Sequence, residues 1–217
     1  VLFPADPIVN APTILDNMAA IFPPREGQYA FGPMARIAFS QPPLVEGKLG
    51  VVIELGSFFN LLILGAVGTR LPTRDAPLVV LEVSFFGEIN PGAGTISFDA
   101  TLQNSRILSW AVSGDMAART GWAPKIDHVV SFGGLHPRYP RPANLPDLRR
   151  MSINFGSNNP RVTLWAYAAI TLNSLQFGAG ADLYAKGPKI PFVGRLAAEG
   201  HAYFDALIYF NPFAFDA

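Results

Sequence analysis

The chain has 217 residues, 16 basic and 16 acidic side chains, no cysteine and a hydrophobic fraction of 50%. A formal net charge of zero argues against a nucleic-acid-binding surface, which needs an excess of Lys and Arg, and the absence of cysteine excludes disulfides and thiolate metal sites. Charged residues make up only 15%, against about 25% in an average soluble domain, so either an unusual share of the chain is buried or part of its apolar surface meets something other than water.

Residues 1–28 are predicted to form a linker and one short helix. Asn10 is a candidate N-cap, Pro12 suits the first helical turn, and the apolar residues of 14–22 recur at helical spacing. The pair Pro23-Pro24 would end the helix. Because the chain opens on Val1 without a basic, apolar leader, we expect it to be a processed or internal segment of a longer protein.

Residues 29–217 are predicted to form a single β-rich domain, because apolar and polar residues alternate there with a period of two. The run Asn60–Thr69 is apolar on both faces, which is typical of a buried central strand. Short turns such as Asn90-Pro91-Gly92 favour antiparallel pairing. The expected fold is therefore all-β: an antiparallel meander of about eleven strands, shaped as a curled sheet, groove, barrel or sandwich, with one N-terminal helix.

Two neighbouring predicted strands carry small side chains on what we expect to be their inward faces, namely Ala166 and Ala168 on the first and Ala179 and Ala181 on the second. One explanation is close packing against the helix or another sheet. The other is a groove for an apolar ligand, since ligand pockets are concave and apolar. The glycines of Gly178-Ala179-Gly180 do not form a phosphate loop, and glycine inside a strand marks a bend or a close backbone approach.

The segment His136–Asp147 contains four prolines and must be a loop. It forms, with the residues after it, the most distinctive polar cluster of the sequence. The cluster comprises His136, Arg138, Tyr139, Arg141, Arg149 and Arg150. These side chains suit either a solvated loop held by salt bridges or a contact surface for an acidic partner or for anionic lipid headgroups.

No catalytic, cofactor-binding or metal-ligating set can be assembled from the sequence. The histidines His128, His136 and His201 have no metal-ligand spacing. The close pairs Asp127-His128 and His201 with Asp205 lack a nucleophile placed beside them, and no G-x-S-x-G motif is present. We therefore expect a protein that is not an enzyme and uses no cofactor.

Several local runs resemble a known family: YAFGPMA at 29–35, SGDMA at 113–117, GGLHP at 133–137, GHAYFDA at 200–206 and FNPF at 210–213. Together they are similar to a family of very large, β-rich bacterial proteins that is catalogued as a domain of unknown function. The resemblance covers the chain from about Tyr29 onward. It implies a segment of a longer bacterial protein and brings no catalytic residues.

Three functions are compatible with these observations. The first is a non-enzymatic structural or scaffold module, whose partners are other segments of the parent protein or of an assembly. The second is a module that binds or transfers lipid or another apolar ligand. The third, an outer-membrane β-barrel segment, is disfavoured because Asn60–Thr69 has no polar face and the strand ends lack clear aromatic girdles. The compartment stays open, with an extracellular or envelope location as one alternative.

Overall fold

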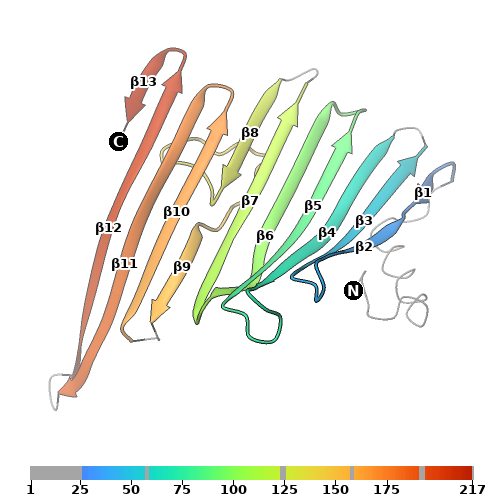
Figure 1. Ribbon diagram of the computed structural model, residues 1–217. Coiled ribbons are helices and arrows are strands. Elements are labelled where there is room, and N and C mark those ends of the chain that lie inside the picture. Colours follow the sequence, from blue (N-terminus) through green and yellow to red (C-terminus); the bar gives the residue numbers. More distant parts are fainter. Residues whose placement is uncertain (1–25, 57–58, 123–125, 157–158, 191–193, 217) are drawn as a thin grey trace.

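The computed structural model describes residues 26–56, 59–122, 126–156, 159–190 and 194–216, and for residues 188–190 and 194 it describes the backbone alone. These residues form one antiparallel sheet of thirteen strands (Figure 1). The strands are β1 (Tyr29–Phe31), β2 (Met34–Phe39), β3 (Val45–Leu55), β4 (Asn60–Leu71), β5 (Val79–Asn90), β6 (Thr95–Ile107), β7 (Trp110–Gly121), β8 (Asp127–Phe132), β9 (Met151–Gly156), β10 (Arg161–Thr171), β11 (Ser174–Ile190), β12 (Gly194–Phe210) and β13 (Phe213–Asp216).

The predicted fold class needs correction. Its all-β, antiparallel character is confirmed, but an all-β fold with an added helix is wrong for this structure, because none of the described residues is helical. The helix was predicted between Asn10 and Phe22, which lie outside the described residues. The described part of the chain likewise contains no helix able to span a membrane. The sheet is open: β1 and β2 lie along one edge, and β12 and β13 along the other.

One place in the strand order is shared by two short strands; we call such a place in the sheet a lane. Strands β8 and β9 both lie between β7 and β10 and run in the same direction, with Phe132 of β8 opposite Met116 and Ser152 of β9 opposite Ser113. The intervening residues, 133–150, leave the lane and return to it. We call this segment the strap, because it packs against the sheet: Leu145 of the strap shares a buried cluster with Ala117 and Val129.

The two faces of the sheet differ in polarity. Residues directly opposite each other in an antiparallel pair share a face, so the register of successive pairs assigns every strand residue to one side. The apolar face carries the following residues and, up to the register shifts in β6 and β11, those two positions along from each: Val51, Ile63, Phe85, Phe98, Met116, Phe132, Ile153, Ala168, Phe177, Ala206 and Phe215. Every Asp, Glu, Lys and Arg of the strands whose side chain is described lies on the opposite, charged face.

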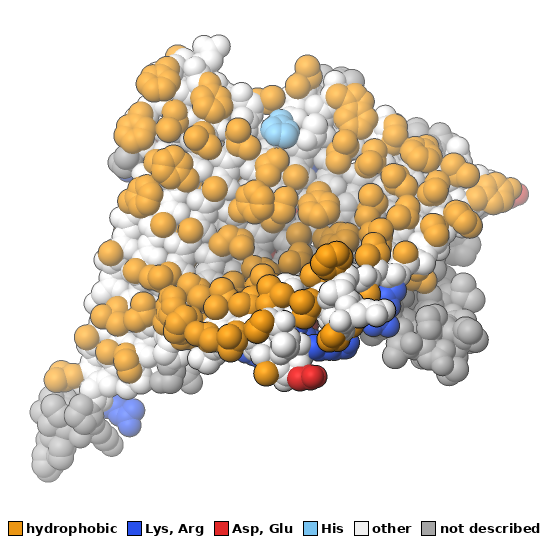
Figure 2. All heavy atoms as spheres, viewed as in Figure 1, with side chains coloured by type: hydrophobic (Ala, Val, Ile, Leu, Met, Phe, Trp, Pro, Cys, Tyr) orange, Lys and Arg blue, Asp and Glu red, His pale blue; other side chains and the backbone are white. Residues whose placement is uncertain are grey.

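The strap covers only the charged face. Its Leu145, supported by Leu135 and Leu148, packs on Ala117 and Val129, which both belong to that face. The buried cluster around Leu145 therefore lies between the strap and the sheet. The apolar face has no such cover among the described residues, and Figure 2 shows apolar side chains spread across the whole width of the sheet.

Candidate functional site

The apolar face is exposed over its full width. Large apolar side chains are accessible from one edge to the other, with exposed fractions of 67% for Phe31, 44% for Ile170 and 79% for Phe213. Folded monomers rarely expose contiguous apolar patches larger than a few hundred Å², and larger patches mark sites that bind a protein, a membrane or a ligand. The apolar face is therefore the main candidate functional surface of the chain (Figure 2).

A shallow, open hollow of about 800 Å³ lies on this face, over β9 to β12. Its floor is made of small side chains: Ala166 and Ala179 are directly opposite each other, and Ala181 is opposite Ala202. Larger side chains such as Leu164 and Phe204 also line it. Because an alanine side chain ends at Cβ, the floor lies lower than these bulkier neighbours.

The structure brings together three of the four alanines that the sequence singled out. Ala166, Ala179 and Ala181 line the hollow, whereas Ala168 lies beside it, opposite Phe177. Among the described residues no second layer packs over them, so the close packing considered in the sequence is not made by this part of the chain. That an apolar ligand binds here stays a prediction.

On the charged face, the strap is held by Arg150. The guanidinium donates one hydrogen bond of 2.9 Å to the carbonyl of Gly133 and one of 3.0 Å to the carbonyl of Leu135. It also lies 3.7 Å from the centre of the Tyr167 ring and 5.8 Å from that of Trp165. Burial lowers the pKa of Arg150 from its ordinary value, and the two carbonyls and two rings together replace the lost water.

A second tether joins the end of the strap to β6 and β7. Arg149 Nε and Nη2 donate hydrogen bonds to the carboxylate of Asp115, Nη2 at 2.7 Å, and the Arg149 backbone N–H donates another of 2.9 Å. Thr101 adds a hydroxyl donor at 2.6 Å. The side-chain hydrogen bond from Arg149 lowers the pKa of Asp115 from 3.8 to about 2, because all these donors favour the ionised carboxylate.

This tether predicts acid sensitivity. Because the folded-state pKa of Asp115 is lowered, its stabilisation is complete above pH 4 to 5 and is lost as pH falls toward 2. Between pH 6 and pH 2, Asp115 should account for about 1–2 kcal/mol of the loss in unfolding free energy, allowing for solvent screening. Asp115→Asn should remove this part of the pH dependence in chemical denaturation, and Arg149→Met should remove the same part. An unchanged pH profile in both variants would contradict the assignment.

The other members of the predicted polar cluster also contact the chain itself. The His136 side chain is buried, and its backbone N–H donates to Gln176 Oε1 at 2.9 Å. Arg138 pairs with Asp216 of β13, and Tyr139 stacks on Tyr209 of β12. Arg141 forms an exposed pair with Asp147 within the strap, at 3.3 Å. The cluster thus tethers the strap across several strands, and a contact with an acidic partner or lipid headgroups stays a prediction.

The glycines of β11 make room for two aromatic rings. A Cβ at Gly178 would lie 2.5 Å from Tyr167 Cε1, and a Cβ at Gly180 would lie 2.3 Å from Trp165 Cζ2. The prediction of a close approach at these glycines is therefore confirmed, although the approach is by side chains of β10 as well as by backbone. Tyr167 donates its hydroxyl to Asp205 at 2.7 Å, and burial raises its pKa above the ordinary value.

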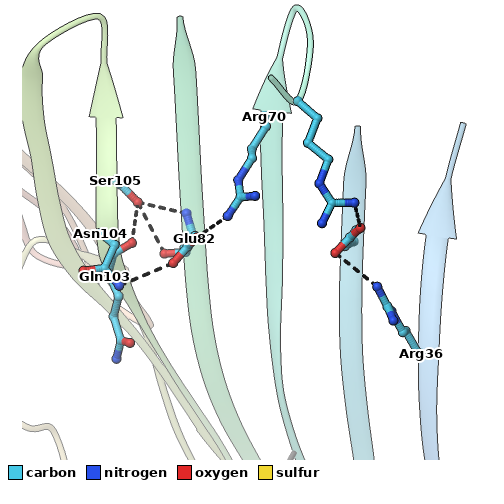
Figure 3. Close-up of polar contacts among 8 residues, drawn as sticks. Arg36, Arg70, Glu82, Gln103, Asn104 and Ser105 are labelled. Atoms are coloured by element: carbon cyan, nitrogen blue, oxygen red, sulfur yellow. Dashed lines mark hydrogen bonds and ion pairs between the residues drawn. The ribbon is translucent and has the colours of Figure 1, made fainter. Parts of the chain in front are cut away.

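A charged cleft of about 320 Å³ lies on the charged face over β2 to β6 (Figure 3). Glu46 bridges Arg36, at 3.5 Å, and Arg74, at 2.9 Å. Glu82 forms an ion pair with Arg70 at 3.4 Å and accepts a hydrogen bond from Asn104 Nδ2 at 3.4 Å. Sequence reasoning missed this cleft, because its residues are spread over positions 36–104 and only the register aligns them. Long, exposed ion pairs of this kind contribute little each to stability.

The histidines lie in three separate places. His128 is on the apolar face with its Nδ1 3.1 Å from the Thr120 hydroxyl, and His136 is in the strap. His201 pairs with Asp182 at 2.7 Å and not with Asp205, which accepts the hydrogen bond of the Tyr167 hydroxyl. Within the described ranges, no group of three His, Cys, Asp or Glu side chains is placed to hold a metal ion.

The comparisons with known proteins identify the family. The model of a family of unknown function (DUF6603) matches residues 1–217, so the chain belongs to this family. The resemblance to a domain of unknown function is thereby confirmed. No curated protein and no solved structure matches the chain.

Proposed function

We propose that this member of DUF6603 is a non-enzymatic structural module of a larger bacterial protein, in which other segments of that protein pack on the apolar face. One observation carries the proposal: all described charged side chains of the strands lie on one face, and the other face is apolar over its whole width. Burial of apolar surface stabilises by about 25 cal/mol per Å². A face of this extent is therefore strongly driven to find an apolar cover.

A second sheet would suit this face. Two sheets pack about 10 Å apart, with large side chains of one layer entering gaps in the other. The apolar face offers such gaps, since Ala166, Ala179 and Ala181 lie among larger residues such as Leu164 and Phe204. The charged face, with its ion pairs and its strap, would then remain in contact with water.

Native mass spectrometry of the longer protein, purified without denaturation, tests this function. If protein segments cover the apolar face, the mass should equal that of the polypeptide or a whole-number multiple of it, with no lipid in stoichiometric amount. Bound lipid at one or more molecules per chain would contradict the structural module and favour the second candidate.

That second candidate is an apolar-ligand or lipid-binding module, and the hollow favours it. Its volume of about 800 Å³ lies within the range of ordinary ligand pockets, about 300–1,000 Å³. Its apolar side chains include Leu164, Ala179 and Phe204, and none of the described charged residues lines it. A lipid acyl chain could lie along the alanine floor without desolvating any charged group.

Filling the hollow separates the two candidates. Ala179→Leu places a larger side chain on the floor, whereas Ala168→Leu adds the same atoms beside it and is the matched control. If the hollow binds an apolar ligand, Ala179→Leu should lose the ligand extracted from the purified protein and Ala168→Leu should keep it. In the free chain, both changes should shift the unfolding free energy by about 0.5 kcal/mol or less, because neither side chain is covered. Ligand retained in Ala179→Leu would contradict binding in the hollow.

A further inference from the structure

The two edges of the sheet have complementary free stretches. At one edge, β13 pairs only with Leu207–Phe210 of β12, so on the side away from β11 residues 196–206 of β12 have no neighbouring strand among the described residues. At the other edge, β1 and β2 continue one register along β3, with Tyr29 opposite Leu55 and Met34 opposite Gly50. Residues 29–39 therefore form one edge lane, which we call the leading lane. The leading lane and the free stretch of β12 have equal length.

The free stretch of β12 lacks the usual devices that prevent pairing at a sheet edge. Native sheets blunt their edges with prolines, bulges or inward-pointing charges, because unpaired N–H and C=O groups are a template for another strand. The free stretch of β12 contains no proline, and the described register shows no bulge between Ala197 and Tyr209. Its exposed side chains include Leu196, at 62%, and Phe204, at 54%.

The backbone of β12 presents its odd-numbered residues to the open edge. Successive residues of a strand turn their N–H and C=O groups to opposite sides. Phe210 donates its N–H to the carbonyl of Asn173 at 2.9 Å, on the β11 side. Even-numbered residues of β12 therefore bond to β11, and the odd-numbered residues from Ala197 to Asp205 face outward. The side chains of these odd-numbered residues lie on the charged face.

The leading lane presents its even-numbered residues outward by the same reasoning. The Val51 N–H donates to the carbonyl of Pro33 at 3.0 Å, so the odd-numbered residues bond toward β3. Pro33 has no N–H, but its backbone faces β3, so the outer edge loses no hydrogen-bond donor. The outward residues Ala30, Met34, Arg36 and Ala38 also lie on the charged face. On both edges, therefore, the residues whose backbone groups face outward have their side chains on the charged face. Two strands that pair edge to edge need this match, because directly opposite residues share a face.

We propose that the leading lane of a second copy of this chain pairs antiparallel with the free stretch of β12, with Arg36 of that copy opposite Glu199. The remaining positions then agree in character: on the apolar face Phe39 meets Leu196 and Phe31 meets Phe204. Arg36 is 66% exposed and holds Glu46 only at 3.5 Å. Glu199 is exposed and has no ion pair among the described residues, so the two charges are free to meet on the charged face.

The proposed contact is heterologous, because it joins two different edges. Repetition of the contact does not close on a twofold axis and leads to a ring or an open-ended array of more than two copies. Each added copy would continue the sheet with the same face apolar. The inference does not depend on what covers the apolar face, because edge pairing uses backbone groups in the plane of the sheet.

Sedimentation velocity on the purified chain over a range of concentrations is the first test. The chain should form a series of species above the dimer. Tyr203→Pro removes an outward N–H of β12 and leaves the bonds to β11 intact, so it should weaken association about tenfold or more. Tyr203→Ala, which keeps the N–H, is the matched control and should associate like the parent chain. A chain that stays monomeric at every concentration would overturn the proposal.

A charge exchange tests the register and does not depend on a proline. Arg36→Glu and Glu199→Arg each place like charges opposite each other, so each should weaken association roughly threefold to tenfold. An equimolar mixture of the two variants restores opposite charges at every contact and should associate like the parent chain. Association that is unaffected by either exchange and by Tyr203→Pro would assign it to the apolar face and overturn edge pairing.

Discussion

Gly180→Ala should destabilise the chain by about 3 kcal/mol, near the upper end of the range for overpacking. The new Cβ would lie 2.9 Å from the carbonyl oxygen of Ala202 and would overlap the Trp165 ring. Neither group can move freely, because the carbonyl belongs to the β12 backbone and the ring is held between β11 and the Arg150 guanidinium.

Gly200→Ala is the matched control for this change. Gly200 lies in the neighbouring strand β12, and a Cβ there would meet nothing closer than the Leu183 Cβ, at 3.9 Å. The control should therefore change the unfolding free energy by about 0.5 kcal/mol or less. Urea denaturation of both variants measures the difference. Equal losses at the two positions would show that the aromatic rings do not lie on β11 as described.

Arg150→Met should cost about 3 kcal/mol or more. The variant leaves the carbonyls of Gly133 and Leu135 without their donors and removes the contact with the Tyr167 ring. An unsatisfied buried acceptor costs about 1–3 kcal/mol, and a desolvated cation–π contact contributes about 2 kcal/mol. Methionine keeps most of the aliphatic length, so the loss reports the guanidinium and not the packing of the stem.

The control for Arg150 lies in the same strap. Arg141 forms an exposed pair with Asp147, whose side chain is 96% exposed, and Arg141→Met should cost about 1 kcal/mol or less. Limited proteolysis gives a second readout, because release of the strap in Arg150→Met should expose cleavage sites in residues 133–150. Equal stability of the two variants would contradict the anchoring role of Arg150.

The alternation of the sequence predicted the strands well, since period-two patterning is a local property. It also separated the two faces correctly, as in β10, where Leu164 and Ile170 lie on one side and Trp165 and Tyr167 on the other. It did not predict that the strap covers the opposite face. We expected the alanine-bearing face to point inward, yet in the described residues Trp165 and Tyr167 lie under the strap and Ile170 is 44% exposed.

Alternation in the sequence shows that the two faces of a strand differ in polarity, but it does not show which segment covers each face. The cover of Tyr167 comes from the strap, some 17–34 residues earlier in the chain, and no local pattern encodes that return. The prolines of the strap indicated a loop but not its position within a split lane. In the same way, three of the four alanines of the hollow could be named from the sequence, whereas the charged cleft around Glu46 and Glu82 required the strand register.

We propose that this chain is a segment of a longer protein, in which the apolar face is covered. The chain has no cysteine, so single cysteines can report each face of β10: Ile170→Cys on the apolar face and Arg161→Cys on the charged face. The rate of maleimide labelling, measured in the free chain and in the longer protein, tests the claim directly. We expect both cysteines to react in the free chain, and Ile170→Cys alone to be protected in the longer protein. Equal labelling of Ile170→Cys in both would contradict the claim.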